Sequence, residues 1–400
     1  MKLFRQLLVA PTSLILLAPI AGNASEVNLN EVSNYTDEGL EITSKSFENK
    51  LAETEAPLLA GGEGMTGSHN HEGPNSFSDT TVATQTVDML LTGGSGEDSF
   101  VDVESVGFSY YYGMSLDTSF DGNDNLNIVI ETGNTDTTAG NSVQQILDFG
   151  AANTDKLNIA DVNYTRSFGD LTIMVGDSLD ASSQYAGACS YSGFTDHLSD
   201  CGTGLSAGLG GDVSLSSSYD MGNGFVLGLG LTGAEAASSK GFFTKESADA
   251  FGAQLAYAAD SYGAAISYST IDAYNGASAL IGVDEDTKAL GLNAYYNFGG
   301  PIESLNVGYE TADPDSGTDT SNWFAGLTTS EVGPGSINIG VGTKAHTTDS
   351  ASELMIYEAS YSWDVNDGIS MTLGGFIMEQ EDTVAREDFT GVALKSTFSF

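Results

Sequence analysis

The stretch "VGFSYYYGMSL" (106–116) has large apolar side chains at every second position, and this pattern is the strongest indication of the fold. The intervening positions hold glycine, serine and one aromatic residue, Tyr111. The same alternation recurs in "FVLGLGL" (225–231), "YGAAISY" (262–268) and "GISMTLGG" (368–375). Side chains alternate between the two faces of a β-strand, so each stretch predicts a strand with one apolar face and one small or polar face.

The connections between these stretches alternate in length. Short ones such as "SFGD" (167–170) and "MGNG" (221–224) alternate with long acidic ones such as 177–211 and 272–287. We count about sixteen strands of ~9–13 residues between residue 77 and residue 400, long enough to cross a membrane at a ~45° tilt. The pattern predicts an all-β, transmembrane antiparallel β-barrel with short periplasmic turns and long acidic extracellular loops. The alternative is a soluble β-sandwich or a β-helix repeat protein, for which strands of ~5–6 residues are usual.

Composition narrows the function. The 12 Lys and Arg residues against 55 Asp and Glu residues give a formal charge of −43, which excludes nucleic acid as a partner because phosphate binding requires a basic surface. The 17 Tyr, 19 Phe and 49 Gly residues favour many strands over acidic disorder. The sequence has no HExxH motif and no phosphate-binding glycine loop beside a helix, so we do not expect an enzyme, and nothing indicates a cofactor.

The chain start predicts export. Residues 1–24 combine a basic start, an apolar stretch and small residues before Ser25, which is the pattern of a cleaved signal peptide. Residues 25–76 are polar and predict a short periplasmic arm, followed by the barrel over 77–400. Within this arm His69 and His71 share one face of an extended segment and are weak candidates for a metal site; a solvated linker is the alternative.

Several segments resemble one known family. The start "MKLFRQLLVAPTSLILLAPIAGNASEVNLNEVSNY", the stretch "LDTSFDGNDNLNIVIETGN" (116–134) and the closing "STFSF" are similar to outer-membrane porins of marine cyanobacteria. The resemblance implies a porin barrel related to the carbohydrate-selective porins, in a family associated with ion or iron uptake. Members usually carry an S-layer-homology domain and a coiled-coil stalk after the signal peptide. Here only about fifty residues occupy that place, so the sequence departs from the family in its means of attachment to the cell wall.

The longest loop contains both cysteines. Cys189 and Cys201 lie in "ACSYSGFTDHLSDC" (188–201), and an oxidising compartment predicts that they form a disulfide. In the chain-entropy model, such a bond stabilises the loop by about 3 kcal/mol. Two placements of this loop stay open: folded into the pore as a constriction, or rigid on the surface.

Carboxylates in the other long loops predict a negative pore mouth, which would concentrate cations and repel anions. They are Asp284, Glu285, Asp286, Asp313, Asp315, Glu379, Glu381 and Asp382. In the last strand Lys395 alternates with apolar neighbours, so we expect it to face the lumen. The terminal "VALKSTFSF" (392–400) presents Phe398 and Phe400 on the lipid side, and a final aromatic residue resembles the signal that the outer-membrane barrel assembly machinery recognises.

We therefore expect a porin of the cell outer membrane that lets small hydrophilic solutes and ions diffuse passively, with a preference for cations. The alternatives are a substrate-selective channel for carbohydrate or iron and, in another class, a plugged structural or adhesive surface barrel. The expected partners are outer-membrane lipid, the assembly machinery, and small solutes and ions. Porins of this size are commonly trimers, and the sequence shows no trimer face, so a homotrimer stays an open alternative.

Overall fold

A computed structural model describes most of the predicted barrel. The described residues are 80–96, 106–135, 143–147, 149, 155–211, 213–234, 239, 241–244, 247–273, 286–315, 319–343, 346–347, 354–379 and 388–400. The predicted signal peptide (1–24) and arm (25–76), including His69 and His71, lie outside them.

Within these residues one antiparallel sheet contains 17 strands, of which β14 has only 2 residues, so sixteen longer strands form the wall. The strands are β1 Thr81–Ser95, β2 Val106–Thr118, β3 Asp124–Gly133, β4 Asn158–Phe168, β5 Leu171–Asp177, β6 Val213–Gly222, β7 Phe225–Gly233, β8 Asp249–Ala258, β9 Tyr262–Asp272, β10 Thr287–Asn297, β11 Ile302–Pro314, β12 Thr320–Thr329, β13 Gly335–Thr343, β14 His346–Thr347, β15 Met355–Asn366, β16 Ile369–Met378 and β17 Phe389–Ser399. Three single-turn helices, α5 Val143–Ile146, α6 Asp196–Ser199 and α7 Gly204–Ala207, lie in loops.

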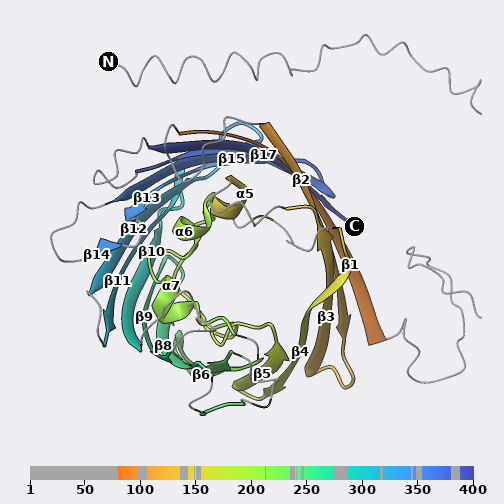
Figure 1. Ribbon diagram of the computed structural model, residues 1–400, viewed down its shortest axis with the longest axis vertical. Coiled ribbons are helices and arrows are strands. Elements are labelled where there is room, and N and C mark those ends of the chain that lie inside the picture. The colour runs from red at the N-terminus through yellow and green to blue at the C-terminus, as the bar shows by residue number, and fades with distance from the viewer. Residues whose placement is uncertain are drawn as a thin grey trace, which may run out of the picture. The chain divides into compact units, whose positions relative to one another are not determined.

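The sheet closes on itself. β1 pairs with β2 on one side and with β17 on the other, so the sixteen longer strands form the ring seen in Figure 1. The last residue takes part in the closure, because Phe400 and Gln85 exchange two backbone hydrogen bonds of 2.9 and 3.0 Å. This confirms the predicted closed barrel of about sixteen antiparallel strands. None of the helices in the described part of the chain is long and apolar enough to span a membrane.

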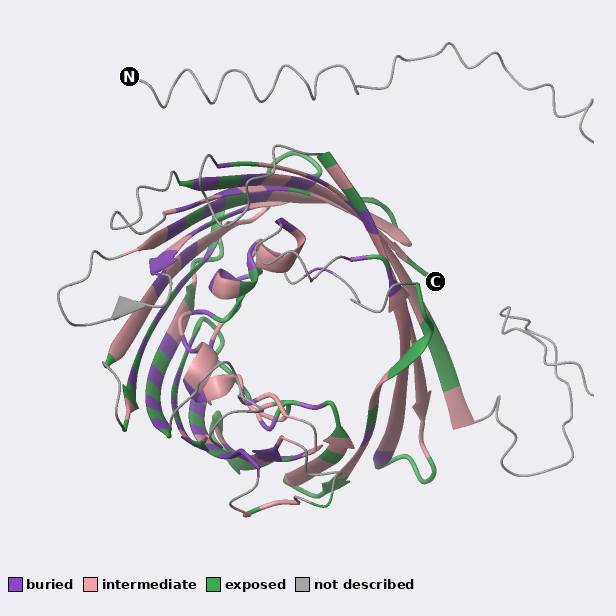
Figure 2. Cartoon of the chain, viewed as in Figure 1, coloured by how far each residue is buried: buried purple, intermediate pink, exposed green. Residues whose placement is uncertain are grey.

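The two-residue period of the sequence places alternate side chains on the inner and the outer face of the barrel. Along β9 the side chains of Ile266 and Tyr268 are exposed on the outer face, whereas Ser267 and Ser269 are buried on the inner face. Figure 2 shows this alternation as bands of purple and green along β9, β10 and β11. Such regularity follows from the pleat of a strand, which directs successive side chains to opposite faces.

Connections at the two ends of the barrel differ in length, as the sequence predicts. At the end that carries Phe400, β6 and β7 are joined by Asn223 and Gly224 alone, with φ of 55° and 85°. Positive φ at both positions is the type I′ geometry that Asn-Gly favours in tight hairpins. At the opposite end the β5–β6 connection runs from residue 178 to residue 212.

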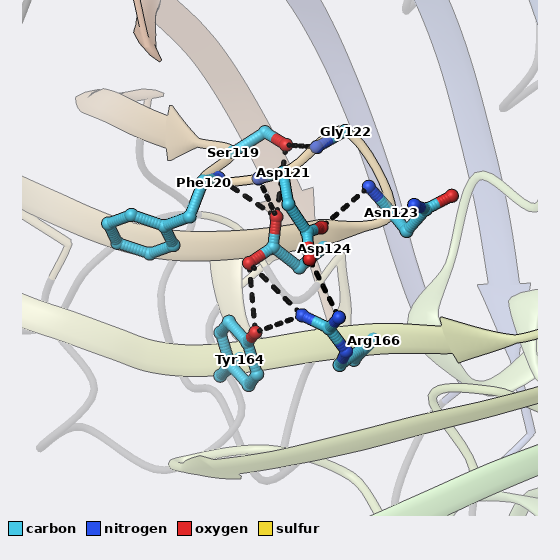
Figure 3. Close-up of polar contacts among 8 residues, drawn as sticks. All are labelled: Ser119, Phe120, Asp121, Gly122, Asn123, Asp124, Tyr164 and Arg166. Carbon is cyan, nitrogen blue, oxygen red and sulfur yellow. Dashed lines mark hydrogen bonds and ion pairs between the residues drawn. The ribbon is translucent and has the colours of Figure 1, made fainter. Parts of the chain in front are cut away.

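The five-residue β2–β3 turn at the short end is fixed by the carboxylate of Asp124 (Figure 3). Its Oδ1 accepts the backbone N–H of Phe120 at 2.8 Å and of Asp121 at 3.1 Å. On β4 the Tyr164 hydroxyl donates to Asp124 Oδ2 at 2.9 Å, and Arg166 forms an ion pair with Asp121 at 2.7 Å. The turn and the neighbouring β4 are therefore held as one unit.

Candidate functional site

The long β5–β6 loop, residues 178–211, folds into the barrel. Figure 1 shows α6 and α7 of this loop inside the ring of strands. Leu198 is 1% exposed, and Thr195 and Ser206 are fully buried. Of the two placements that the sequence leaves open, the structure has the one inside the pore. We call residues 178–211 the lumenal loop.

Cys189 and Cys201 are joined in a disulfide within this loop, as predicted, and the bond encloses α6. Cys201 has a φ of 52°, so the chain turns sharply there. Its carbonyl lies against Gly308 of β11, at a point where any Cβ on residue 308 would collide with it. The disulfide therefore closes a compact unit that contacts the barrel wall directly.

One carboxylate of the wall, Glu358 on β15, binds the first part of the loop. Its Oε1 accepts the Tyr191 hydroxyl at 2.7 Å and the Phe194 N–H at 2.8 Å. Its Oε2 accepts the N–H and the hydroxyl of Thr195 at 2.7 and 2.6 Å. Burial, and then the Glu358 carboxylate, raise the pKa of Tyr191, so its phenol keeps the proton that it donates.

A second wall carboxylate, Glu310 on β11, binds the loop beyond the disulfide. Its Oε2 accepts the N–H and the hydroxyl of Ser206, both at 2.6 Å. Its Oε1 accepts the N–H of Leu205 at 3.2 Å. These are the first free N–H groups of α7, which have no partner within the helix. Each carboxylate thus satisfies backbone donors that the loop itself leaves unpaired.

Neutral side chains of the wall accept further backbone donors of the loop. Asn306 Oδ1 accepts the Ser190 N–H at 2.8 Å, and Gln254 Oε1 accepts the Gly187 N–H at 2.9 Å. The loop has no strand partner, and buried backbone N–H groups must be hydrogen-bonded. Polar side chains at inward positions of the wall therefore replace a sheet ladder along the loop.

Inward-facing glycines lie beneath the loop and let it approach the wall. A Cβ on any of these glycines would meet a loop atom closer than ordinary van der Waals contact allows. They are Gly228, Gly230, Gly252, Gly291, Gly308, Gly326, Gly340, Gly342 and Gly374. The glycines that alternate with leucine in "LGLGL" (227–231) therefore leave the space that the loop occupies against the wall.

The β3–β4 loop also contributes to the lumen through α5. The Gln144 amide donates to Thr92 Oγ1 of β1 at 3.2 Å and to Ser109 Oγ of β2 at 3.4 Å. Val143 packs in the same buried apolar cluster as Leu198 of the lumenal loop. Two loops thus meet inside the barrel and narrow it.

A cavity of about 410 Å³ lies between these loops and the wall. Its lining contains three aromatic rings, those of Tyr111, Phe149 and Phe194. Of the described residues that line it, Asp88 is the one carboxylate and Lys395 the one cation. The remaining polar lining consists of the hydroxyl and amide groups of Ser192, Ser199, Asn338, Ser360, Ser362 and Thr372. Lys395 therefore faces the lumen, as the alternation of the last strand predicts.

The carboxylates predicted at the pore mouth are only partly within the described residues. Asp284, Glu285, Glu381 and Asp382 lie outside them. Asp286 accepts the Ala273 N–H at 2.9 Å, and Glu379 accepts the Met355 N–H at 3.1 Å, so both fasten the ends of strands. Asp313 falls in the outward row of β11, and Asp315 lies 3.9 Å from the outward Lys288, which places both at the outer rim.

Sequence reasoning missed Glu310 and Glu358. A signal was present, since each is a single glutamate at an inward position of an alternating strand, in "VGYETA" (307–312) and "IYEASY" (356–361). A charge at such a position requires a partner, because an unpaired buried carboxylate is costly. The sequence does not reveal that this partner is the loop.

No protein-family model matches the sequence, and no curated protein is significantly similar to it. OprB of Pseudomonas putida superposes with a TM-score of 0.63 at 11% identity, over 81% of this chain and 95% of that chain. A loop-deletion mutant of OmpT, an outer membrane protein of Vibrio cholerae, gives 0.54 at 10% identity, over 80% and 100%. A mutant porin of Rh. blastica gives 0.46 at 15% identity, over 80% and 100%. The superpositions on OprB and OmpT show that the chain has the fold of the outer-membrane porin barrels.

Proposed function

We propose that this protein is an outer-membrane channel through which small hydrophilic solutes and ions diffuse passively. The observation that carries the proposal is the combination of a polar lumen, narrowed by an inward loop, with an apolar outer wall. A closed barrel satisfies all backbone hydrogen bonds within the sheet, which is what a strand-built membrane protein requires. The resemblance of the chain ends to cyanobacterial porins is part of this proposal.

The outer wall supports a position in lipid. Along β7 to β10, in the part of the barrel wall that the structure describes, Lys288 beside the end of β10 is the one charged side chain at the outward positions between the strand ends. The other outward positions hold Phe225, Leu227, Leu229, Leu231, Phe251, Ala253, Leu255, Tyr257, Tyr262, Ala264, Ile266, Tyr268, Thr270, Leu290, Leu292, Ala294 and Tyr296. Aromatic rings cluster toward the short-turn end. The ring centroids of Phe225 and Tyr257 are 4.8 Å apart there, and those of Tyr296 and Phe298 are 4.9 Å apart. An aliphatic band with an aromatic girdle is the outer surface of a transmembrane barrel.

Cation preference is supported by the charges of the lumen. Glu131 and Asp161 lie close enough to interact electrostatically, and Asp161 also interacts with Asp180 of the lumenal loop. Against these carboxylates stands Lys395, the one cation of the cavity lining among the described residues. Carboxylates along a pore favour cations and repel anions.

Planar-bilayer recording tests this function. Purified, folded protein should give stable single-channel currents, and a salt gradient should shift the reversal potential toward the value for cations. A folded barrel that carries no current would contradict the channel proposal, whereas a current carried mainly by anions would contradict the cation preference alone. A shift in gel mobility on boiling verifies beforehand that the barrel is folded.

A carbohydrate-selective channel is the second candidate. The observation that favours it is the group of Tyr111, Phe149 and Phe194 around one cavity that also contains hydroxyl and amide groups. Pockets that combine aromatic surface with a few placed polar groups are typical of small-molecule sites. Sugar added to one side of the bilayer should then interrupt the current reversibly, and a current unaffected by sugar favours the general channel.

We also propose that the C-terminal aromatic residues direct assembly. Phe400 is 69% exposed at the short-turn end, although its backbone closes the barrel against Gln85. Its ring is therefore accessible from outside even in the closed barrel. Deleting Phe400 should lower the amount of barrel inserted in the outer membrane more than it changes the current of molecules that do insert; equal insertion of both proteins would contradict this role.

A further inference from the structure

We propose that Glu358 and Glu310 are positioning residues that hold the lumenal loop against one wall of the barrel and thereby set the conductance of the pore. The inference rests on the proposed channel function. It assigns to two wall carboxylates the control of a loop on which the width of the lumen depends.

The first argument is the chemistry of the two carboxylates. Glu310 is 1% exposed and Glu358 is 4% exposed, yet neither forms an ion pair with any described residue. Removing a carboxylate from water is unfavourable unless hydrogen bonds replace its hydration. All of the hydrogen bonds described for these two side chains come from the lumenal loop. Both groups are therefore matched to the loop in its present position.

The second argument is that the same arrangement occurs twice. In the sheet register Glu358 is paired with Gly340, and Glu310 is paired with Gly291. A Cβ at residue 340 would crowd the Tyr191 hydroxyl, and a Cβ at residue 291 would collide with Ser206. Each anchor thus combines a carboxylate that accepts loop donors with a facing glycine that gives the loop room to reach it.

The third argument is where the two anchors act along the loop. Glu358 binds residues 191–195, Glu310 binds residues 205–206, and the disulfide closes 189–201. Glu358 therefore binds residues inside the segment that the disulfide closes, and Glu310 binds the segment that follows it. Because the wall lies directly behind the loop, a released loop moves only toward the open lumen. We expect release to lower the mean current and to make it fluctuate.

Glutamine is a sharp test because of how the donors are divided. At Glu358 each oxygen accepts one backbone N–H and one hydroxyl, so a Glu358→Gln amide in either orientation sets an NH₂ group against an N–H that cannot accept and forces a hydroxyl to reverse. At Glu310 one oxygen accepts only the Leu205 N–H, so Glu310→Gln retains the two bonds of Ser206. The first substitution should therefore release the loop more than the second. Glu303→Gln on β11 is the matched control, since it removes a carboxylate that has no described bond to the loop.

The experiment measures loop attachment and current separately. Hydrogen exchange of the folded, detergent-solubilised protein reports on the loop without reference to conduction. In Glu358→Gln the amides of Phe194 and Thr195 should exchange on the order of tenfold faster or more, and in Glu310→Gln that of Leu205 somewhat faster. Single-channel recording should give a lower and noisier current for Glu358→Gln, an intermediate one for Glu310→Gln and the wild-type current for Glu303→Gln.

The outcomes separate this inference from the proposed function. Faster exchange with an unchanged current, or unchanged exchange, would overturn the positioning role. Variants that lose the heat-dependent gel shift are unfolded, and for these the exchange pattern of Glu310→Gln, whose bonds are mostly retained, decides the question. If the wild-type protein carries no current while the amides respond as expected, the two carboxylates do hold the loop and it is the channel function that fails.

Discussion

The two walls of the barrel differ in what their inner faces contact. On β8 to β13 the inner face is covered by the lumenal loop, and Ser269 and Asn306 are fully buried there. On β2 to β4 the inner face is open to the lumen, and most of its side chains, including Tyr111 and Glu131, are partly exposed. Figure 2 shows sharp purple and green bands along β9 to β11 of the first wall, whereas the second wall is mostly pink.

The size of the inward side chains indicates which wall the loop covers. Both walls have the same outward apolar row and the same two-residue period. The inward positions of the covered wall are largely glycine, alanine and serine, whereas those of the open wall include Tyr111, Asn127 and Glu131. The covered wall is thus shaped for packing and the open wall for contact with solute. Four experiments test this contrast, and they follow in order of decreasing expected effect.

Replacing one glycine on each wall with valine should lower the stability much more on the covered wall than on the open wall. In Gly308→Val the new side chain collides with the Cys201 backbone, which cannot move without the loop, and we expect a loss of about 3 kcal/mol of stability. In Gly113→Val the three nearest atoms all belong to the Tyr111 side chain, which shifts more readily than backbone does. Urea denaturation followed by gel mobility measures both, and equal losses would refute the contrast between the walls.

Removing the disulfide should loosen the loop but leave the barrel closed. The bond joins residues separated by 12 positions, so Cys189→Ser with Cys201→Ser should cost the loop about 3 kcal/mol in the chain-entropy model. Exchange should accelerate for loop amides, while strand amides of the open wall keep their protection. Faster exchange throughout β2 to β4 would show that the loop supports both walls.

Charge changes beside the open lumen should alter selectivity in opposite directions. Asp161→Asn removes a carboxylate from the open wall and should reduce the cation-to-anion permeability ratio on the order of twofold. Lys395→Gln removes the cation of the cavity lining and should raise the same ratio. Reversal potentials in a salt gradient measure both variants. A shift in the same direction for the two would contradict the electrostatic account.

The smallest effect is expected for a charge on the outer rim. Lys288 and Asp315 are 3.9 Å apart with exposed side chains, and exposed pairs contribute only ~0–1 kcal/mol. Lys288→Ala should therefore leave both stability and reversal potential near the wild-type values. A change in selectivity as large as that of Lys395→Gln would mean that rim charges, and not lumen charges, control permeation.

Local sequence pattern was sufficient to predict the barrel. Alternation identified strands such as β2 and β9, and the alternating lengths of the connections predicted their antiparallel order and the end at which the chain terminates. Both signals are local, because the pleat and the hairpin turns are determined by neighbouring residues. The disulfide was predictable because Cys189 and Cys201 have no competing cysteine.

The position of the lumenal loop could not be predicted in the same way. It depends on Glu358, which lies 163 residues from the hydroxyl of Thr195 that it binds, and on glycines spread over many strands. No local period marks such distant partners. The role of the predicted mouth charges stays a prediction; Asp313, for example, lies in the outward row near the end of β11, a position that loop composition alone does not specify.

The seam between β1 and β17 has a consequence for how the chain acquires its fold. The hydrogen bond from the Thr397 hydroxyl to Asp88 joins residues 309 positions apart. Every other long strand has its neighbour within a hairpin or a single loop, so those pairs form early, while the seam requires nearly the whole chain to be synthesised. Until then two unpaired strand edges are open to other chains. A chain terminated anywhere before β17 would therefore form an open sheet with unpaired, aggregation-prone edges instead of a smaller pore.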